Sequence, residues 1–166
     1  LRIARDNEAL LTRQLDAIAQ AAEARDDKAS TWVMAPMVAT STEAQWFANL
    51  CRERGLTAGA MIEVPAAALM ADKIMPHLDF VSIGTNDLTQ FLFAADRAHP
   101  KLAERYDWLS PAILRFLRRV VRSVEGHNVE IAVCGEMGGK PIETLALIAL
   151  GYRSFSMSSA SVGPVK

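Results

Sequence analysis

The sequence has no apolar run that approaches the roughly 20 residues needed to cross a bilayer, so it offers no candidate for a transmembrane helix. Residues 1 to 20 also lack the basic start and apolar core of a signal peptide. The 18 Lys and Arg are balanced by 19 Asp and Glu, so the broad positive charge of a nucleic-acid-binding protein is missing. These absences predict a protein without membrane or nucleic-acid partners, in which any anionic ligand is held locally.

Cysteine is equally scarce. Cys51 and Cys134 are the only two, they stand far apart, and neither belongs to a metal-ligand spacing, so free thiols in a cytoplasmic protein are expected. The 166 residues are 51% apolar, which is enough to build the core of one globular domain. Because the chain opens at Leu1 without an initiator Met, we interpret it as part of a longer protein.

Short β-type runs alternate with longer helical patterns along the chain. Strands are predicted at 31–37, 58–64, 80–84, 130–135 and 154–158, and helices at 6–24, 42–55, 65–75, 110–126 and 141–151. The strands are continuous apolar stretches, as in sheets that are covered on both faces. Crossovers of helical length connect parallel strands, so the fold class is α/β with a parallel sheet.

Polar side chains that strands normally exclude follow three of the predicted strands. Glu63 comes after “AMI”, Asn86 and Asp87 come after “FVSIGT”, and Cys134 and Glu136 flank the glycine after “IAV”. The carboxyl ends of parallel strands share one rim, and in α/β folds that rim holds the active site. The sequence therefore predicts that these residues form one site.

Glu63 and Asp87 are suited to bind a hard divalent cation together, because Mg²⁺ uses one or two protein carboxylates and completes its octahedron with water and substrate oxygens. The alternative is that each carboxylate caps the helix that follows it. The turn “GTND” also places backbone N–H groups beside a helix start, a geometry that binds anions.

Arg97 and Cys134 each have two interpretations. Arg97 either grips a phosphate or carboxylate with its guanidinium, or forms an ion pair with Asp96 or Glu104. Cys134 is either a small core residue or, at the rim of the sheet, an acid or nucleophile. The basic segment “RFLRRVVR” at 115–122 is interpreted as one solvated helix face.

Five motifs together resemble a known family. “MIEVPAAAL”, “FVSIGTNDLTQ”, “DR” at 96–97, “CGEMGG” and “FSMS” occur in the order and spacing of the C-terminal domain of phosphoenolpyruvate-protein phosphotransferase, Enzyme I of the bacterial phosphotransferase system. The resemblance covers roughly residues 31 to 166, and the ending “SMSSASVGPVK” is more similar to the nitrogen-related branch than to the sugar branch. It implies a PEP/pyruvate-type (β/α)₈ TIM barrel, of which residues 1–166 supply the C-terminal part, about five βα units.

The resemblance also implies a role for each matching residue. Glu63 and Asp87 would be the ligands of Mg²⁺ or Mn²⁺, and Asn86 with the Asp87 backbone would cradle phosphoenolpyruvate. Arg97 would grip the phosphate. Cys134 would be the acid that delivers a proton to the methylene carbon of the substrate.

In the family's reaction, phosphoenolpyruvate phosphorylates a histidine of a separate N-terminal domain, which passes the group to a small phosphocarrier protein (HPr-like) and leaves pyruvate. That domain and the first barrel strands are expected to lie outside this chain, and the protein is expected to form a homodimer. Pyruvate phosphate dikinase and phosphoenolpyruvate synthase are similar in the same motifs. A non-catalytic module for dimerisation or phosphoenolpyruvate sensing is the alternative from another class.

Overall fold

Four parallel strands form one sheet in the computed structural model, which describes residues 1, 3–27, 29–103 and 107–166. They are β1 (Trp32–Ala35), β2 (Thr57–Ile62), β3 (Phe80–Gly84) and β4 (Glu130–Cys134). The strands lie side by side in the order of the sequence, β1-β2-β3-β4, and every pair is parallel. The fifth predicted strand, 154–158, is reduced to one isolated parallel bridge between Val133 and Phe155.

Helices connect and follow these strands. They are α1 (Glu8–Glu23), α2 (Ser41–Arg52), α3 (Pro65–Leu69), α4 (Ala71–Ile74), α5 (Thr85–Leu92), α6 (Pro100–Ala103), α7 (Pro111–Val124), α8 (Pro141–Leu150) and α9 (Ser159–Val165), with 3₁₀ helices η1 (Met75–His77) and η2 (Glu136–Gly139). The single helix predicted at 65–75 is divided because Met70 leaves the helical region, with φ −104° and ψ 21°. No helix of the described ranges is both long and apolar enough to cross a membrane.

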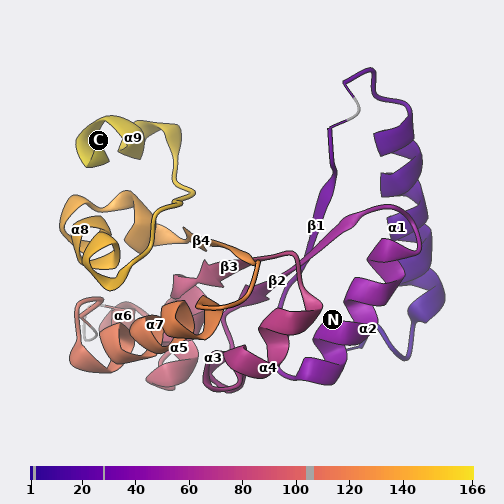
Figure 1. Ribbon diagram of the computed structural model, residues 1–166. Helices are drawn as coiled ribbons and strands as arrows, with labels where there is room; N and C mark the ends of the chain where they lie inside the picture. Colours follow the sequence, from indigo (N-terminus) through magenta and orange to yellow (C-terminus); the bar gives the residue numbers. More distant parts are fainter. Residues whose placement is uncertain (2, 28, 104–106) are drawn as a thin grey trace.

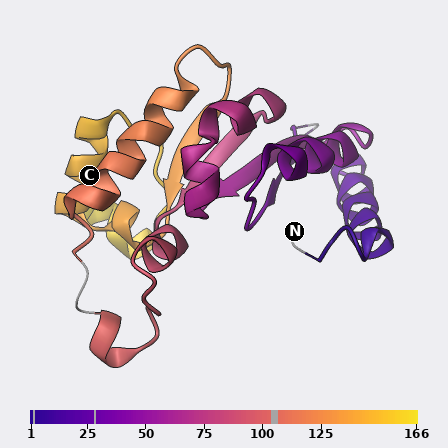
Figure 2. The same ribbon diagram turned by 90° about the horizontal axis from the view of Figure 1, so that it is seen from below.

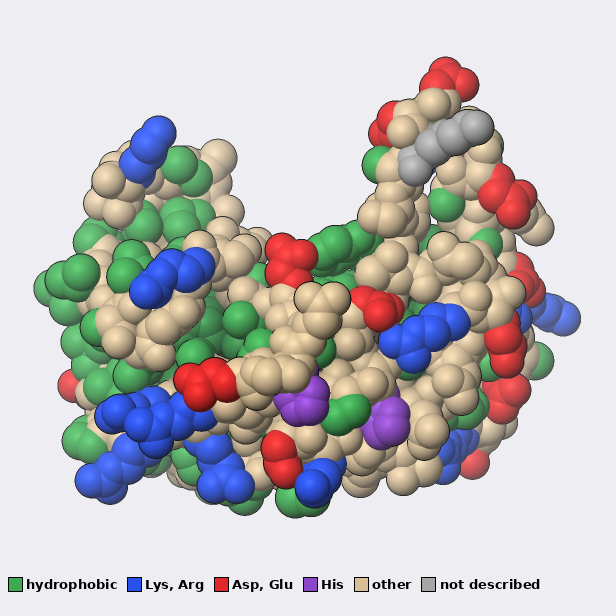
Figure 3. Space-filling view, in the orientation of Figure 1, with side chains coloured by type: hydrophobic (Ala, Val, Ile, Leu, Met, Phe, Trp, Pro, Cys, Tyr) green, Lys and Arg blue, Asp and Glu red, His purple; other side chains and the backbone are tan. Residues whose placement is uncertain are grey.

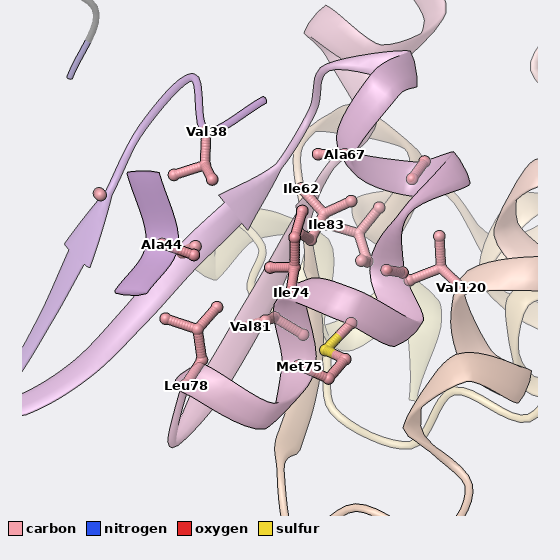
Figure 4. Close-up of a cluster of buried hydrophobic side chains, with 14 of the residues drawn as sticks. Val38, Ala44, Ile62, Ala67, Ile74, Met75, Leu78, Val81, Ile83 and Val120 are labelled. Carbon is pink, nitrogen blue, oxygen red and sulfur yellow. The ribbon is translucent and has the colours of Figure 1, made fainter. Parts of the chain in front are cut away.

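The helices that follow the strands cover one face of the sheet. Figure 1 shows α2, α3, α4, α5 and α7 below the strands, and Figure 2, seen from that side, shows α2, α3, α4 and α7 in front of them. Strand side chains alternate between faces, and those on the covered face, such as Ala60, Ile62 and Ile83, are fully buried. Figure 4 shows Ile62 and Ile83 clustered with Ile74 of α4, so the main core lies between the sheet and these helices.

The opposite face of the sheet is left open. Its side chains include Trp32, which is 47% exposed, and Phe80, whose ring centroid lies 4.8 Å from that of Trp32. The Phe80 ring crosses β2 at Gly59, where a Cβ atom would come within 2.3 Å of it. Figure 3 shows this side of the molecule as a hollow between the part that carries α8 and α9 and the part that carries α1. A sheet with helices on one face and a concave second face is the geometry of part of a barrel wall.

Candidate active site

The predicted site residues meet at the carboxyl-terminal edge of the sheet. Ile62 pairs with Ile83, so Glu63 follows β2 beside Gly84. Gly84 in turn pairs with Cys134, the last residue of β4. A Cβ atom on Gly84 would lie 2.8 Å from the Glu63 carboxylate oxygen Oε2, which shows how closely this side chain crosses the end of β3. The rim expected from the sequence is therefore formed by β2, β3 and β4.

Glu63 is a buried carboxyl group with one strong hydrogen bond. It is 3% exposed, and its Oε1 accepts a hydrogen bond from the backbone N–H of Met37 at 2.7 Å. Met37 reaches this position with φ 54°, a left-handed conformation that is strained for a residue with a side chain. The helix-capping alternative for Glu63 is wrong, because the N-cap residue of α3 is Val64 and no side chain caps that helix.

Asp87 lies against Glu63 from the first turn of α5. Burial raises the pKa of the Glu63 carboxyl above its ordinary value, and the negative charge of Asp87 and a hydrogen bond with it raise the pKa further. The Met37 N–H and the positive charge of Arg97 act in the opposite direction. Two carboxyl groups held this close favour a shared proton or a shared cation over two free negative charges.

Among the residues that the structure describes, Arg97 pairs with Asp87 and not with Asp96. Its Nη2 lies 3.5 Å from Oδ1 of Asp87, while Asp96 accepts a hydrogen bond from the backbone of Ala98 and Glu104 lies outside the described residues. The guanidinium remains half exposed. The backbone N–H of Arg97 donates to the side chain of Gln90 in α5, which ties this loop back to the helix.

Asn86 is oriented by the loop that follows β4. Its Oδ1 accepts a hydrogen bond from the backbone N–H of Glu136 at 3.0 Å, so its NH₂ group points elsewhere and has no partner among the residues that the structure describes. Gly135 makes this contact possible, because its φ is 94° and a Cβ atom there would lie 2.9 Å from Asn86 Oδ1. Asn86 therefore presents a free donor at the rim.

Cys134 is half-buried beside the same cluster. Its Sγ is 3.4 Å from the carbonyl oxygen of Ile83, to which the thiol donates, and its own carbonyl accepts a hydrogen bond from Thr85 Oγ1. The thiol thus stands on the neighbouring strand at the level of Gly84. It is neither a fully buried core residue nor a surface group.

A hollow of about 480 Å³ opens beside Asn86 and the loop after β4. It is lined by Asn86, Gly135, Glu136, Gly139, Lys140, Ser156, Met157, Ser158 and Ser161. Sequence reasoning did not single out the Lys140 and serine side chains, although the dense polar run after Phe155 signals a rim segment. In the described part of the chain no three His, Cys, Asp or Glu side chains gather as a complete metal-binding group. In that part of the chain, Glu63 and Asp87 are two carboxyl groups that lie against each other at the rim.

Comparison with known protein families matches the whole chain. The family described as PEP-utilising enzyme, PEP-binding domain, covers residues 1–166. A phosphoenolpyruvate-protein phosphotransferase of Streptomyces coelicolor is 40% identical over 168 residues, which is 100% of this chain and 30% of that protein. A multiphosphoryl transfer protein of Rhodobacter capsulatus is 36% identical over 173 residues, 100% of this chain and 20% of that protein. The chain thus spans less than a third of the length of these relatives.

Solved structures show the fold. A citrate lyase of Burkholderia xenovorans superposes with a TM-score of 0.68 at 18% identity, over 93% of this chain and 52% of that one. An HpcH/HpaI aldolase/citrate lyase family protein of Burkholderia cenocepacia superposes with a TM-score of 0.61 at 15% identity. The superposition covers 92% of this chain and 63% of that one. These are TIM-barrel-like proteins, and the expected partial α/β barrel is confirmed.

Proposed function

The chain belongs to the PEP-utilising enzymes, as their PEP-binding domain, and on this premise we propose that it is the phosphoenolpyruvate-binding part of a phosphoenolpyruvate-protein phosphotransferase. The observation that carries the proposal is that two neighbouring carboxyl groups, an arginine and a thiol meet at one rim. The names of the relatives support a protein acceptor for the phosphoryl group.

The anionic substrate is held by donors that the fold leaves free. The half-exposed Arg97 guanidinium still has N–H groups to donate to the phosphate beside its contact with Asp87. The NH₂ group of Asn86 is a second donor. The first turn of α5 adds backbone N–H groups that no side chain caps, at the helix end where anions are favoured.

Glu63 and Asp87 are the residues that would hold Mg²⁺ or Mn²⁺. The fit is good because both groups offer hard oxygen ligands. Burial and, to a smaller extent, the negative charge of Asp87 raise the pKa of Glu63, and a cation would offset both effects. When bound, the cation supplies Lewis-acid stabilisation of negative charge on the substrate oxygens.

Cys134 supplies the proton that completes pyruvate. Cleavage of the P–O bond leaves its electron pair on the substrate oxygen while the phosphoryl group passes to a histidine nitrogen. The thiol of Cys134 then gives its proton to the methylene carbon and becomes a thiolate, which takes the proton back in the reverse direction. The Sγ–H must first turn away from the Ile83 carbonyl.

The acceptor histidine belongs, in this proposal, to another domain of the full protein. His77 of this chain lies in η1 and is hydrogen-bonded to Ser41, and the proposal gives it no part in the transfer. We further propose an HPr-like phosphocarrier as the next acceptor, a homodimeric protein and a cytoplasmic location. The choice between the sugar and nitrogen branches rests on the ending of the sequence alone.

Titration calorimetry of the purified chain with phosphoenolpyruvate, with and without Mg²⁺, tests the proposal. Binding is expected in the presence of Mg²⁺ and about tenfold weaker binding for Arg97→Gln, because a charge-assisted contact is lost. Arg13→Gln removes the same charge from an exposed position of α1 and is the matched control. Absence of binding by the wild-type chain, or equal binding by the two variants, counts against the proposed site.

Gly135→Ala is expected to weaken phosphoenolpyruvate binding by tenfold or more, because the new methyl group would push Thr85 and Asn86 out of place. Gly126→Ala is the control, since Gly126 also has a positive φ, 87°, but its Cβ would meet nothing within 4 Å. Both variants are expected to lose about 1 kcal/mol of stability from the left-handed backbone. Calorimetry and urea unfolding separate the two effects, and an equal loss of binding in both variants would contradict the positioning of Asn86 by Gly135.

A further inference from the structure

Helix α7 carries four arginines on one exposed face. Arg115, Arg118, Arg119 and Arg122 follow one another at spacings of three and four residues, which places them on the same side of the helix. All four are exposed, while Ile113, Leu117 and Val120 on the other side are buried in the core. The face is therefore solvated, as the sequence predicts, but its charge is concentrated within two helical turns.

These arginines have no carboxylate partner in the part of the chain that the structure describes. Among the described residues, no ion pair includes any of the four. Within the same residues, only the Arg119 side chain has a hydrogen bond, from Nη2 to the carbonyl oxygen of Leu69 at 3.1 Å. Like charges at these spacings destabilise a helix, so the group is a source of repulsion for as long as no anion lies on it.

The arginines line a surface hollow of about 770 Å³. Phe116 and Ser123 of α7 contribute to it, and Asp72 of α4 forms the opposite rim. Asp72 is the one carboxylate of this lining, and its Oδ2 already lies 3.4 Å from Nζ of Lys73. Figure 3 shows Lys and Arg side chains gathered on the lower side of the molecule, where Figure 1 places α7.

We propose that this arginine hollow binds a compact ligand with two or more linked phosphoryl groups, a free pyrophosphate or the pyrophosphate group of a nucleotide. Guanidinium groups pair with phosphate oxygens through two parallel hydrogen bonds. The four arginines span about 10 Å along the helix axis at 1.5 Å per residue, a length that suits two or three linked phosphates. The chain as a whole carries no excess positive charge, which disfavours an extended polyanion.

The arginine hollow is separate from the candidate active site. It lies in the helix layer and is lined by residues of α4 and α7, whereas Glu63, Asp87 and Cys134 lie at the carboxyl ends of the strands. Neither Arg97 nor Asn86 belongs to its lining. A ligand there would accompany the substrate rather than compete with it.

Equilibrium dialysis of the chain against radiolabelled pyrophosphate, with EDTA present and ionic strength held constant, tests the proposal. Arg118→Gln and Arg122→Gln are each expected to weaken binding about tenfold, and the double variant more than either. Arg119 is left intact because of its bond to Leu69. Arg13→Gln on α1 is the control and is expected to leave pyrophosphate binding unchanged. Circular dichroism confirms that the variants are folded.

Each arm of the experiment has a decisive outcome. Competition by ADP as strong as that by pyrophosphate identifies the nucleotide as a ligand, and weaker competition identifies free pyrophosphate; both support the proposal. The proposal would be overturned if sulfate at equal ionic strength displaced the label as effectively as unlabelled pyrophosphate does. It would also be overturned if single-stranded nucleic acid bound more tightly than pyrophosphate. Loss of binding in Arg97→Gln but not in Arg118→Gln would also overturn it, by assigning the anion to the active site.

Discussion

Cys134→Ala is expected to abolish net pyruvate formation by the protein that contains this chain, while phosphoenolpyruvate binding stays within a few-fold of wild type. Alanine keeps the small apolar volume at the end of β4 but has no proton to give to the methylene carbon. The proposed substrate donors, Arg97 and Asn86, are held by other contacts and are expected to remain in place. Pyruvate release and binding are measured on the same preparation.

Cys51→Ala is the control for this experiment. Cys51 is fully buried in α2, and burial raises the pKa of its thiol to about 11, so it remains protonated and closed to substrate. Its replacement is expected to leave turnover unchanged apart from a modest loss of stability. Wild-type turnover in Cys134→Ala would show that another group protonates the product.

Asp87→Asn is expected to remove several kcal/mol of transition-state stabilisation, a loss of about a hundredfold or more in rate, the scale of a lost Lewis-acid contact. The amide is a poorer ligand for a hard cation, and it also releases Arg97 from its ion pair. Because the negative charge of Asp87 contributes to the raised pKa of Glu63, that pKa is expected to fall in the variant. The rate is measured as a function of Mg²⁺ concentration.

Asp96→Asn is the matched control for Asp87→Asn. Asp96 is next to Arg97 in sequence, but its Oδ1 accepts a hydrogen bond from the Ala98 backbone, as an amide oxygen also can. The rate of the Asp96→Asn variant is expected to depend on Mg²⁺ concentration as the wild-type rate does. If Asp87→Asn showed an unaltered metal dependence as well, Asp87 would not be a ligand.

The sequence predicts the rim because side-chain chemistry and strand ends are both local properties. Continuous apolar runs end at Glu63, Asn86 and Cys134, and parallel pairing then brings those ends together, as the register shows. Proline at the helix starts and glycine at the helix ends predict the bounds of α7 and α8. The observed bounds lie within two residues of the predicted ones. These parts of the prediction depend on the neighbours of each residue in the chain.

The contacts that orient the site depend on tertiary structure and were not predictable in the same way. Nothing in the sequence around Met37 indicates a left-handed backbone whose N–H meets Glu63. Arg97 is reached by Asp87 rather than by its neighbour Asp96, because α5 begins directly after β3 and turns Asp87 toward it. The sequence indicates a helix start beside “GTND” but not the extent of α5, which begins directly after β3 without a loop.

The sequential strand order has a consequence for how the protein is made. In the sheet β1-β2-β3-β4 each strand pairs with the one that precedes it in the chain. Every pairing therefore joins strands that follow one another in the chain, and none waits for a segment beyond the next strand. The sheet can grow one unit at a time as the chain leaves the ribosome. On that route the carboxylates Glu63 and Asp87 would meet when β3 and α5 dock, and the thiol of Cys134, the proposed proton donor, would join them only with β4.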